Sequence, residues 1–361
     1  MRLRGRLAAL GLAVAMPMLP APASGQQDAV GIARPGKTHA GEPESSTQVR
    51  YHMGTLWTVQ ARGPDAFTAV ESAFAEIGRI DRLLSTYRPD SELSRINREA
   101  GKAWVIASPE TRGIIERALG YARMSGGAFD PTVGPLVKLW GFKHLDYRFP
   151  TETAILQAKA KVGHAQVETD EAKGIRYRRA GIEIDLGAIA KGYAVDRALD
   201  KLRERGATMA RVDAGGNQRV WGASAAGKNW VFGIKHPRNA GDVLGWTEIE
   251  AGGISTSGDS ERGFWKDGIR YGHLIDPRAG RPAQGVLSVT VVARDAETAD
   301  AWSTLLYVLG PEAGMKLLGQ HAGVEALWVL AGSASEPYIT LGSKGFRWKP
   351  AAGHGRVKLD G

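Results

Sequence analysis

The order of the apolar segments constrains the fold of this chain more than any other feature. Two stretches show the periodicity of helices: residues 188–204, which Gly206 closes, and residues 296–309, which Gly310 closes. Six short segments have the alternating or continuous apolar pattern of β-strands, namely 182–186, 209–212, 230–234, 269–275, 287–293 and 324–330. Strands in clusters with helices between them predict an α+β domain with mixed sheets and flanking helices, rather than alternating parallel units.

The beginning of the domain reads as a strand and a helix. Val49, Tyr51 and Met53 alternate with polar residues, which predicts a half-buried strand that turns at residues 53–55 and resumes at 56–59. A helix should begin after Asp65 and bury one apolar stripe. The stripe consists of Phe67, Val70, Phe74, Ile77 and Leu84.

Two further helices follow from local signals. Ser108 is a good N-cap residue and Pro109 occupies the first helical position after it, so a helix should open there. Its buried side would be Ile114, Ile115, Ala118 and Tyr121. Residues 151–162 predict another helix.

Residues 1–25 have the pattern of a secretory signal peptide. Arg2, Arg4 and Arg6 precede an apolar run at 7–18 that is too short to span a bilayer, and small residues at 21–25 suit cleavage. The chain contains no cysteine, so we expect neither a lipoprotein anchor, nor disulfides, nor a thiolate metal site. We therefore expect an exported, periplasmic protein that is released from its signal peptide.

The remaining sequence divides into three parts. Residues 26–46 lack periodicity and predict a flexible linker, residues 47–350 should form the folded domain, and residues 351–361 a C-terminal tail. The formal charge of +9 falls to +6 without the three signal-peptide arginines, and it contains no Lys/Arg block of the kind that binds nucleic acid. The excess fits either an ordinary solvated surface or one that tolerates anionic substrates.

Five segments interrupt the amphipathic pattern with Gly, Asp, Asn, Thr or Lys and are typical of site loops. They are residues 85–97, 127–131, 185–193, 213–217 and 256–259. In residues 185–193, a strand would end at Asp185 and a turn of small residues would lead into a helix. Lys191 would lie one turn into that helix. Such a junction could present amides and a positive dipole to a phosphate, or it could be a plain strand-to-helix connection. It matches neither the P-loop nor the dinucleotide glycine pattern.

Asp300 and Thr304 are four residues apart on a predicted helix, so a carboxylate and a hydroxyl share one face. These oxygen ligands suit a hard cation such as Mg²⁺, completed by a backbone carbonyl and substrate phosphates. The alternative is a buried helix in which the threonine bonds back to a carbonyl. The nearby acids Asp295 and Glu297 favour the metal site, because acids beside a buried stripe need partners.

Three other side chains are candidates for the site. His273 precedes Asp276 and Arg278, so a neighbouring acid could orient its imidazole as a general base, although a lone histidine is often structural. Tyr87 and Phe129 could stack on a planar ring or simply belong to the core.

Taken together, these motifs resemble, in content and order, the ApbE-type FAD:protein FMN transferases over roughly residues 49–345. The matching segments are 53–55, 87–97, 127–130, 185–193, 215–217, 256–258, 273–277 and 299–301 with Thr304. The resemblance implies an extracytoplasmic, Mg²⁺-dependent enzyme that splits FAD, attaches FMN through a phosphoester to a threonine of a partner flavoprotein, and releases AMP. Respiratory flavoprotein subunits would be the acceptors.

By matching position, the resemblance also assigns roles to residues. His273 would be the catalytic base, and the Ala188 carbonyl with Asp300 and Thr304 would hold Mg²⁺. The FAD site would be lined by Met53, Tyr87, Ala128, Phe129, Asp130, Asp185, Lys191 and Ile275. The chain departs from some members in lacking a lipobox cysteine and in placing Trp302 in the metal-binding helix.

Two other functions use the same residues. Water in place of the threonine would make the protein an FAD pyrophosphatase that yields FMN and AMP. A non-catalytic periplasmic FAD-binding protein would hold FAD unchanged, and the Asp300/Thr304 pair argues against it.

Overall fold

The computed structural model describes residues 44–224, 227, 229–239, 241–333 and 338–351, and the backbone of 357–359. The predicted signal peptide lies outside the described residues, as do most of the predicted linker and tail. Within this range the chain forms seven α-helices and several β-sheets, so the predicted α+β class is confirmed. None of the helices in these ranges is both long and apolar enough to cross a membrane.

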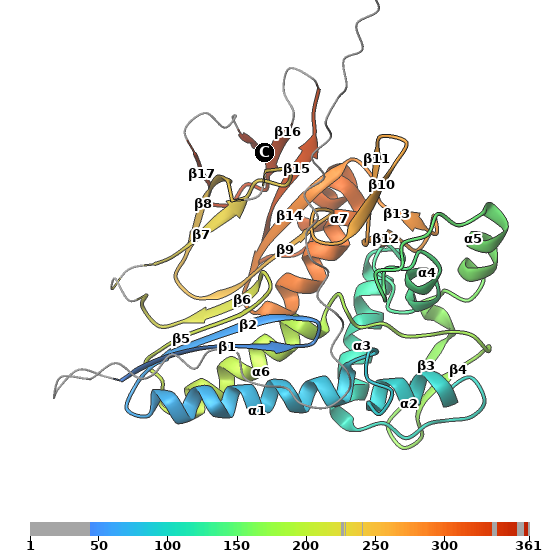
Figure 1. Ribbon diagram of the computed structural model, residues 1–361, viewed down its shortest axis with the longest axis horizontal. Coiled ribbons are helices and arrows are strands. Elements are labelled where there is room, and N and C mark those ends of the chain that lie inside the picture. The colour runs from blue at the N-terminus through green and yellow to red at the C-terminus, as the bar shows by residue number, and fades with distance from the viewer. Residues whose placement is uncertain are drawn as a thin grey trace, which may run out of the picture.

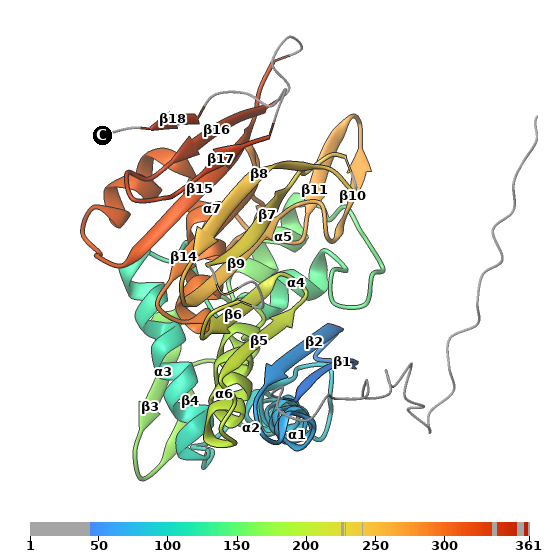
Figure 2. The ribbon, with the colours of Figure 1, turned by 90° about the vertical axis from the view of Figure 1, so that its left-hand side faces the viewer.

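A nine-stranded sheet forms the centre of the molecule, and its strands rise from β2 near the bottom of Figure 2 to β16 near the top. Neighbouring strands are antiparallel except for the last pair, which is parallel. In spatial order the strands are β1 (Ser45–His52), β2 (Thr55–Arg62), β5 (Met209–Ala214), β6 (Asn217–Trp221), β9 (Gly252–Gly258), β14 (Val286–Ala293), β15 (Val324–Ala331), β16 (Tyr338–Gly342) and β18 (Val357–Leu359).

The two faces of this sheet are covered differently. One packs against a three-stranded sheet of β17 (Lys349–Pro350), β8 (Val243–Ile249) and β7 (Trp230–Lys235). The apolar cluster between them consists of Met209, Val220, Trp230, Phe232, Ile249 and Ile254. The long helices α1 (Ala66–Leu84), α6 (Ala190–Glu204) and α7 (Ala296–Leu318) pack against the other face, and α6 packs against both α1 and α7 (Figure 1).

The remaining elements gather beside the sheet, on the right of Figure 1. The helices among them are α2 (Glu92–Glu99), α3 (Pro109–Met124), α4 (Gly134–Leu139), α5 (Glu152–Lys159) and the 3₁₀ turn η1 (His164–Gln166). The strands form three hairpins: β3 (Val167–Asp170) with β4 (Gly174–Tyr177), β10 (Gly263–Lys266) with β11 (Ile269–Gly272), and β12 (Ile275–Asp276) with β13 (Arg281–Pro282). These segments supply one wall of the site described below.

Local sequence signals located several element ends correctly. Ser108 caps α3 by accepting a hydrogen bond from Thr111 N, and Thr151 caps α5 in the same way. Helix α6 ends before Gly206, whose φ of 78° is the left-handed conformation that glycine adopts at least cost. Gly310 (φ 75°) marks a break in α7 rather than its end, because Pro311 suits the first turn of a second helical segment that runs to Leu318.

Two surface assignments were wrong. Val49 and Tyr51 are 43% and 64% exposed, because the inner side of β1 is taken by Arg50 and His52, which both lie against the Phe74 ring. Phe67 is 47% exposed, whereas the predicted stripe partners Val70, Phe74, Ile77 and Leu84 are buried. The outer strand of the hairpin therefore buries its polar residues by stacking their side chains on an aromatic ring.

The predicted strand at 182–186 is not part of a sheet. It is extended but makes only one isolated bridge, between Glu183 and Val133. The side chain of Asn97 replaces a neighbouring strand: its Nδ2 donates to the Ile184 carbonyl and its Oδ1 accepts from Ile184 N, both at 2.8 Å. The amide side chain of Asn97 therefore makes the two backbone hydrogen bonds that a neighbouring strand would otherwise make with Ile184.

Three other segments also differ from their predicted form. Residues 269–275 split into β11 and β12, with His273 and Leu274 between them. Half of the predicted 85–97 loop is helix α2, which Ser91 caps. Residues 256–258 belong to β9, whose small side chains let it pack beneath α7.

Candidate active site

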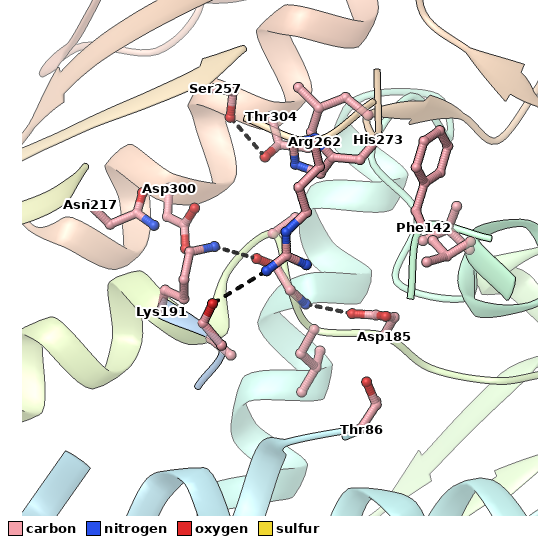
Figure 3. A pocket seen from close by; sticks show the side chains of 18 of the residues that line it. Thr86, Phe142, Asp185, Lys191, Asn217, Ser257, Arg262, His273, Asp300 and Thr304 are labelled. Carbon is pink, nitrogen blue, oxygen red and sulfur yellow. Dashed lines mark hydrogen bonds between the residues drawn. The ribbon is translucent and has the colours of Figure 1, made fainter. Parts of the chain in front are cut away.

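A cavity of about 550 Å³ brings together all twelve residues to which the sequence resemblance gave roles. Each of the five predicted site loops contributes to its lining, although four of them are partly helix or strand. Figure 3 shows side chains from β6, β9, α6 and α7 converging on the same space. The predicted residues in the lining are Met53, Tyr87, Ala128, Phe129, Asp130, Asp185, Ala188, Lys191, His273, Ile275, Asp300 and Thr304.

Asp300 and Thr304 project from α7 into this cavity, as their spacing predicts. The Asp300 carboxylate is 3% exposed and accepts a hydrogen bond from Gly192 N at 2.9 Å. Burial raises the pKa of Asp300, while the positive charge of Lys191 and the Gly192 amide act in the opposite direction. A carboxylate taken out of water in this way needs a cation.

Thr304 does not make the back-bond that was its alternative role. Its hydroxyl lies 3.2 Å from Ser257 Oγ on β9, and the Asp300 carbonyl accepts from Ser303 instead. The threonine oxygen therefore remains directed at the cavity that Asp300 also lines.

The Ala188 carbonyl is in a position to be a third oxygen ligand. Helix α6 begins at Ala190, and Gly192 N, which would bond the carbonyl four residues earlier in a continuing helix, donates to Asp300. No group of three or more His, Cys, Asp or Glu residues with metal-binding geometry occurs in the described part of the chain. One carboxylate, one hydroxyl and one carbonyl fit Mg²⁺, which usually keeps several positions for water or substrate phosphates.

Lys191 supplies a positive charge beside this cluster. It is the second residue of α6, earlier in the helix than the sequence suggested, and its Nζ donates to the Gly187 carbonyl at 3.0 Å. Asp185 accepts from Gly187 N at 2.8 Å and so fixes the same turn. The helix start, the turn and the ammonium group together form an anion-favouring corner of the cavity.

His273 lies in the cavity wall directly after β11. Its backbone N–H donates to the Arg262 carbonyl at 3.1 Å, and its buried Nδ1 has no hydrogen-bond partner among the described residues. Burial lowers the pKa of His273 to about 4, and the charges of Lys191 and Arg262 add to the effect. The imidazole is therefore neutral at neutral pH, which is the form that can accept a proton.

The acids predicted to assist these groups have other partners. Asp276 bonds the backbone and guanidinium of Arg278, so it does not orient His273. Asp295 is the N-cap of α7 and accepts from Thr298 N, whereas Glu297 pairs with Arg117. Because of these contacts, none of the three carboxylates joins Asp300 and Thr304, and Asp300 is the acid of α7 that lines the cavity.

The two candidate aromatic residues have different surroundings. Tyr87 is 51% exposed at the cavity, and its hydroxyl accepts a hydrogen bond from Arg262 at 3.2 Å. Lys143 Nζ lies over its ring, 5.7 Å from the centroid, so a ligand would meet a ring that already contacts a cation. Phe129 is 3% exposed and packs against Tyr121, which makes it mainly a core residue at the cavity floor. Trp302 is also buried and contacts His321, outside the cavity lining.

Asp130 is a structural centre of the cavity wall. Its Oδ1 accepts from the backbone and hydroxyl of Thr132, at 2.9 and 2.6 Å. Its Oδ2 accepts from His164 N and lies 2.9 Å from His164 Nδ1. Both oxygens are therefore engaged within the protein, and a contact between Asp130 and a ligand would have to share them.

Among the lining residues that were not assigned a role from the sequence, four have charged, amide or aromatic side chains. Glu261 and Arg262 precede β10, Phe142 follows α4, and Asn217 opens β6. Asn217 lies in a glycine-rich motif that the resemblance did include, whereas Glu261, Arg262 and Phe142 lie outside every motif. Their positions depend on contacts distant in sequence, such as the bond from Arg262 to the Gly54 carbonyl.

The sequence of this chain matches the family model of the ApbE family over residues 53–328. It is 34% identical to the FAD:protein FMN transferase of Treponema pallidum over 297 residues, which cover 77% of this chain and 82% of the relative. A Klebsiella pneumoniae protein of the same name is 36% identical, with 71% and 80% covered.

Solved structures agree with this relationship. The ApbE protein of Thermotoga maritima superimposes with a TM-score of 0.75 at 36% identity, covering 81% of this chain and 96% of that one. The Pseudomonas stutzeri flavinyl transferase ApbE, in its apo form, gives 0.74 at 30% identity, with 85% and 97% covered. Family model, relatives and fold lead to one conclusion: this chain belongs to the ApbE family.

Proposed function

We propose that this protein is an FAD:protein FMN transferase that depends on Mg²⁺. The relatives that carry this name span most of the chain, so the transferase class rests on the family. The single observation that carries the proposal here is the convergence of Asp300, Thr304, Lys191 and His273 on one cavity. Its volume of about 550 Å³ falls within the ordinary range of ligand sites.

In the proposed reaction, a threonine hydroxyl of the acceptor protein attacks the FMN-side phosphorus of the FAD diphosphate. A new phosphorus–oxygen bond joins FMN to the threonine, the bond to the AMP oxygen breaks, and AMP leaves with the electron pair. Such a transfer requires alignment and charge neutralisation rather than covalent participation of the enzyme. The hydroxyl proton must go to a base as the new bond forms.

The chain's own residues divide these tasks. His273, neutral and in the cavity wall, is the acceptor of the threonine proton. Lys191 balances the charge of the diphosphate from the start of α6. Asp300, Thr304 and the Ala188 carbonyl would hold Mg²⁺, whose chemistry is to neutralise phosphate oxygens during the transfer.

The flavin and adenine rings need apolar and aromatic surface, which the same cavity offers. Tyr87 stands exposed at the cavity, and Met53, Ala128, Phe129 and Ile275 line it. We assign these residues, with Asp130 and Asp185 as supports of the loops, to FAD binding.

The setting of the reaction follows from the N-terminal pattern. A signal peptide at 1–25 would deliver the enzyme to the periplasm without a lipid anchor, where exported subunits of respiratory flavoproteins would be acceptors. Mass measurement of the protein purified from the periplasm tests this step. The expected mass is that of a chain starting near residue 26, and an intact N-terminus on a cytoplasmic protein would contradict it.

The central test is incubation with FAD, Mg²⁺ and a threonine-containing acceptor fragment, followed by mass measurement of the acceptor. The proposal requires a gain equal to FMN less water, together with AMP. Release of AMP at the same rate without acceptor, and no change in acceptor mass, would indicate a pyrophosphatase. FAD that stays intact would indicate a binding protein.

A variant identifies the base in the same assay. His273→Ala should abolish FMN transfer while FAD binding, followed by flavin fluorescence, stays close to that of the unaltered protein. Full transfer by this variant would remove His273 from the catalytic role.

A further inference from the structure

A chain of buried hydroxyl groups runs behind the proposed metal ligands. Ser303, on α7 and 0% exposed, donates to the Asp300 carbonyl at 2.9 Å. Ser257, on β9 and 9% exposed, lies 2.8 Å from Ser303 Oγ and 3.2 Å from Thr304 Oγ1. The serine and threonine hydroxyls therefore connect Thr304 to the backbone carbonyl of Asp300 through a neighbouring strand. Figure 3 shows the contact between Ser257 and Thr304.

Because each hydroxyl has a single proton, the donor and the acceptor of each hydrogen bond in this series can be assigned. A hydroxyl has one proton to donate and two lone pairs that accept. A carbonyl cannot donate, so the Ser303 proton goes to the Asp300 carbonyl. Ser257 must then donate to Ser303, and Thr304 must donate to Ser257. The direction is Thr304 to Ser257 to Ser303 to the carbonyl of Asp300.

The neighbouring serine does not change this direction. Ser255 lies 3.1 Å from Ser303, but its proton goes to Asn217 Oδ1 at 2.5 Å. Ser255 Oγ can therefore only accept from Ser303, and the Asp300 carbonyl, at 2.9 Å, is the nearer acceptor of that proton. Neither choice directs the Ser303 proton to Ser257, so Ser257 remains the donor to Ser303.

The consequence concerns the Thr304 oxygen. Its proton points toward β9. The two lone pairs therefore lie on the other sides of the oxygen, one of which faces the cavity. A metal ion binds an oxygen lone pair, and a hydroxyl whose proton faces the ion is a poor ligand. Orientation of the hydroxyl is therefore as important as its location.

We propose that Ser257 and Ser303 are positioning residues that turn the Thr304 hydroxyl so that its lone pair faces a divalent cation. The proposal rests on the metal site of the proposed function and deepens it, because it makes cation affinity depend on two serines that are not among the proposed ligands. Removal of Ser257 would free the Thr304 proton to turn toward the Asp300 carbonyl. Removal of Ser303 would let Ser257 donate to Thr304 and occupy its lone pair.

The experiment measures cation binding directly. The protein is mixed with excess FAD and no acceptor, and free Mn²⁺ is followed by electron paramagnetic resonance during titration with Mn²⁺. Ser257→Ala and Ser303→Ala should each weaken Mn²⁺ binding by about tenfold or more, as loss of outer-shell partners does at other metal sites. FAD affinity without metal should change less than twofold.

A second readout separates orientation from general damage. In the FMN transfer assay the two variants should need more Mg²⁺ for half-maximal rate, yet approach the unaltered rate at saturating Mg²⁺. A lowered maximal rate with an unchanged Mg²⁺ requirement would overturn the proposal.

Ser288→Ala is the matched control. Ser288 lies on β14 and is 5% exposed, and within the part of the chain that the structure describes its hydroxyl has no hydrogen-bond partner, so its loss should leave Mn²⁺ binding unchanged. Serine variants that bind Mn²⁺ as tightly as the unaltered protein would refute the positioning role alone. An unaltered protein that binds no Mn²⁺ in the presence of FAD would refute both this role and the metal site.

Discussion

The backbone amide of Gly192 donates a 2.9 Å hydrogen bond to the Asp300 carboxylate, across 108 residues of sequence. The bond joins the first turn of α6 to α7 and orients the only carboxylate that α7 brings to the cavity. Helix α6 can approach so closely because residue 192 has no side chain. A Cβ there would lie 2.2 Å from the Ala296 carbonyl oxygen and 2.8 Å from Asp300 Cβ.

Gly192→Ala should therefore separate the two helices. We expect a loss of about 1–3 kcal/mol in the free energy of unfolding, as for other overpacked positions, and weaker Mn²⁺ binding because Asp300 is displaced. Urea unfolding and the Mn²⁺ titration measure the two effects. Gly120→Ala on α3 is the control, since a Cβ there meets no atom closer than 4.0 Å and alanine favours a helix. Equal behaviour of the two variants would show that the close approach of α6 and α7 is unimportant.

The depressed pKa of His273 predicts a pH dependence of stability. In the unfolded chain the imidazole takes up a proton near pH 6.5, whereas in the folded protein it does so near pH 4. The unfolded state thus binds more protons between these values, so the contribution of His273 to stability is complete above pH 6.5 and is lost as the pH falls toward 4. At pH 5 the loss should be on the order of 1–2 kcal/mol.

Urea unfolding at pH 7.5 and pH 5 measures this loss, and the His273→Gln protein, which lacks the group, should lose less between the two values. The imidazole can also be followed by NMR, with the same variant assigning its signal among the eight histidines. Arg262→Gln should raise the pKa of His273, because one of the neighbouring positive charges is removed. Titration of His273 near pH 6.5 in the folded protein would contradict the prediction.

Asn97 should be essential for the segment that leads into the cavity. It satisfies the N–H and carbonyl of Ile184 and accepts from the Tyr177 hydroxyl at 2.7 Å. Asn97→Ala leaves buried backbone groups without partners, so we expect about 2–4 kcal/mol of lost stability and weaker FAD binding. Tyr177→Phe, which removes a single bond, should cost less than half as much. Unfolding curves for the two variants measure both losses of stability. Equal losses would argue against a special role for the two hydrogen bonds between Asn97 and the Ile184 backbone.

Asp130 should act on FAD through the loop that it holds. Asp130→Ala removes the acceptor of the bonds from Thr132 and His164, whereas Asp130→Asn retains one carbonyl oxygen. We expect losses of stability and of FAD affinity that rise together from Asn to Ala, with about 2–3 kcal/mol of stability lost in the latter. FAD affinity that vanishes while the unfolding curve stays unchanged would instead mean that the carboxylate contacts FAD directly.

The parts of the site that depend on local spacing could be predicted from the sequence. Asp300 and Thr304 face the same cavity because four residues make one helical turn, and caps such as Ser108 act on residues three positions away. The family resemblance assigned both Met53 and His273 to the site although they are distant in sequence, and both residues line the cavity.

The parts that depend on distant partners could not be predicted in this way. Apolar residues at 182–186 resemble a strand, but the partner of Ile184 is a side chain 87 residues earlier. Asp276 stands near His273 in sequence, yet it turns to Arg278. Arg262 donates a hydrogen bond to the Gly54 carbonyl, which helps to place it at the site, and no local sequence pattern predicts such a contact.

The late position of α7 in the chain has a consequence for synthesis. Asp300 and Thr304 follow every other assigned residue, and α7 packs on β9 and β14. A polypeptide still emerging from the ribosome can already have Lys191 and His273 while it lacks the two side chains that we propose as ligands of Mg²⁺. The proposed metal site is therefore completed only when the last long helix has been synthesised and has packed on the sheet.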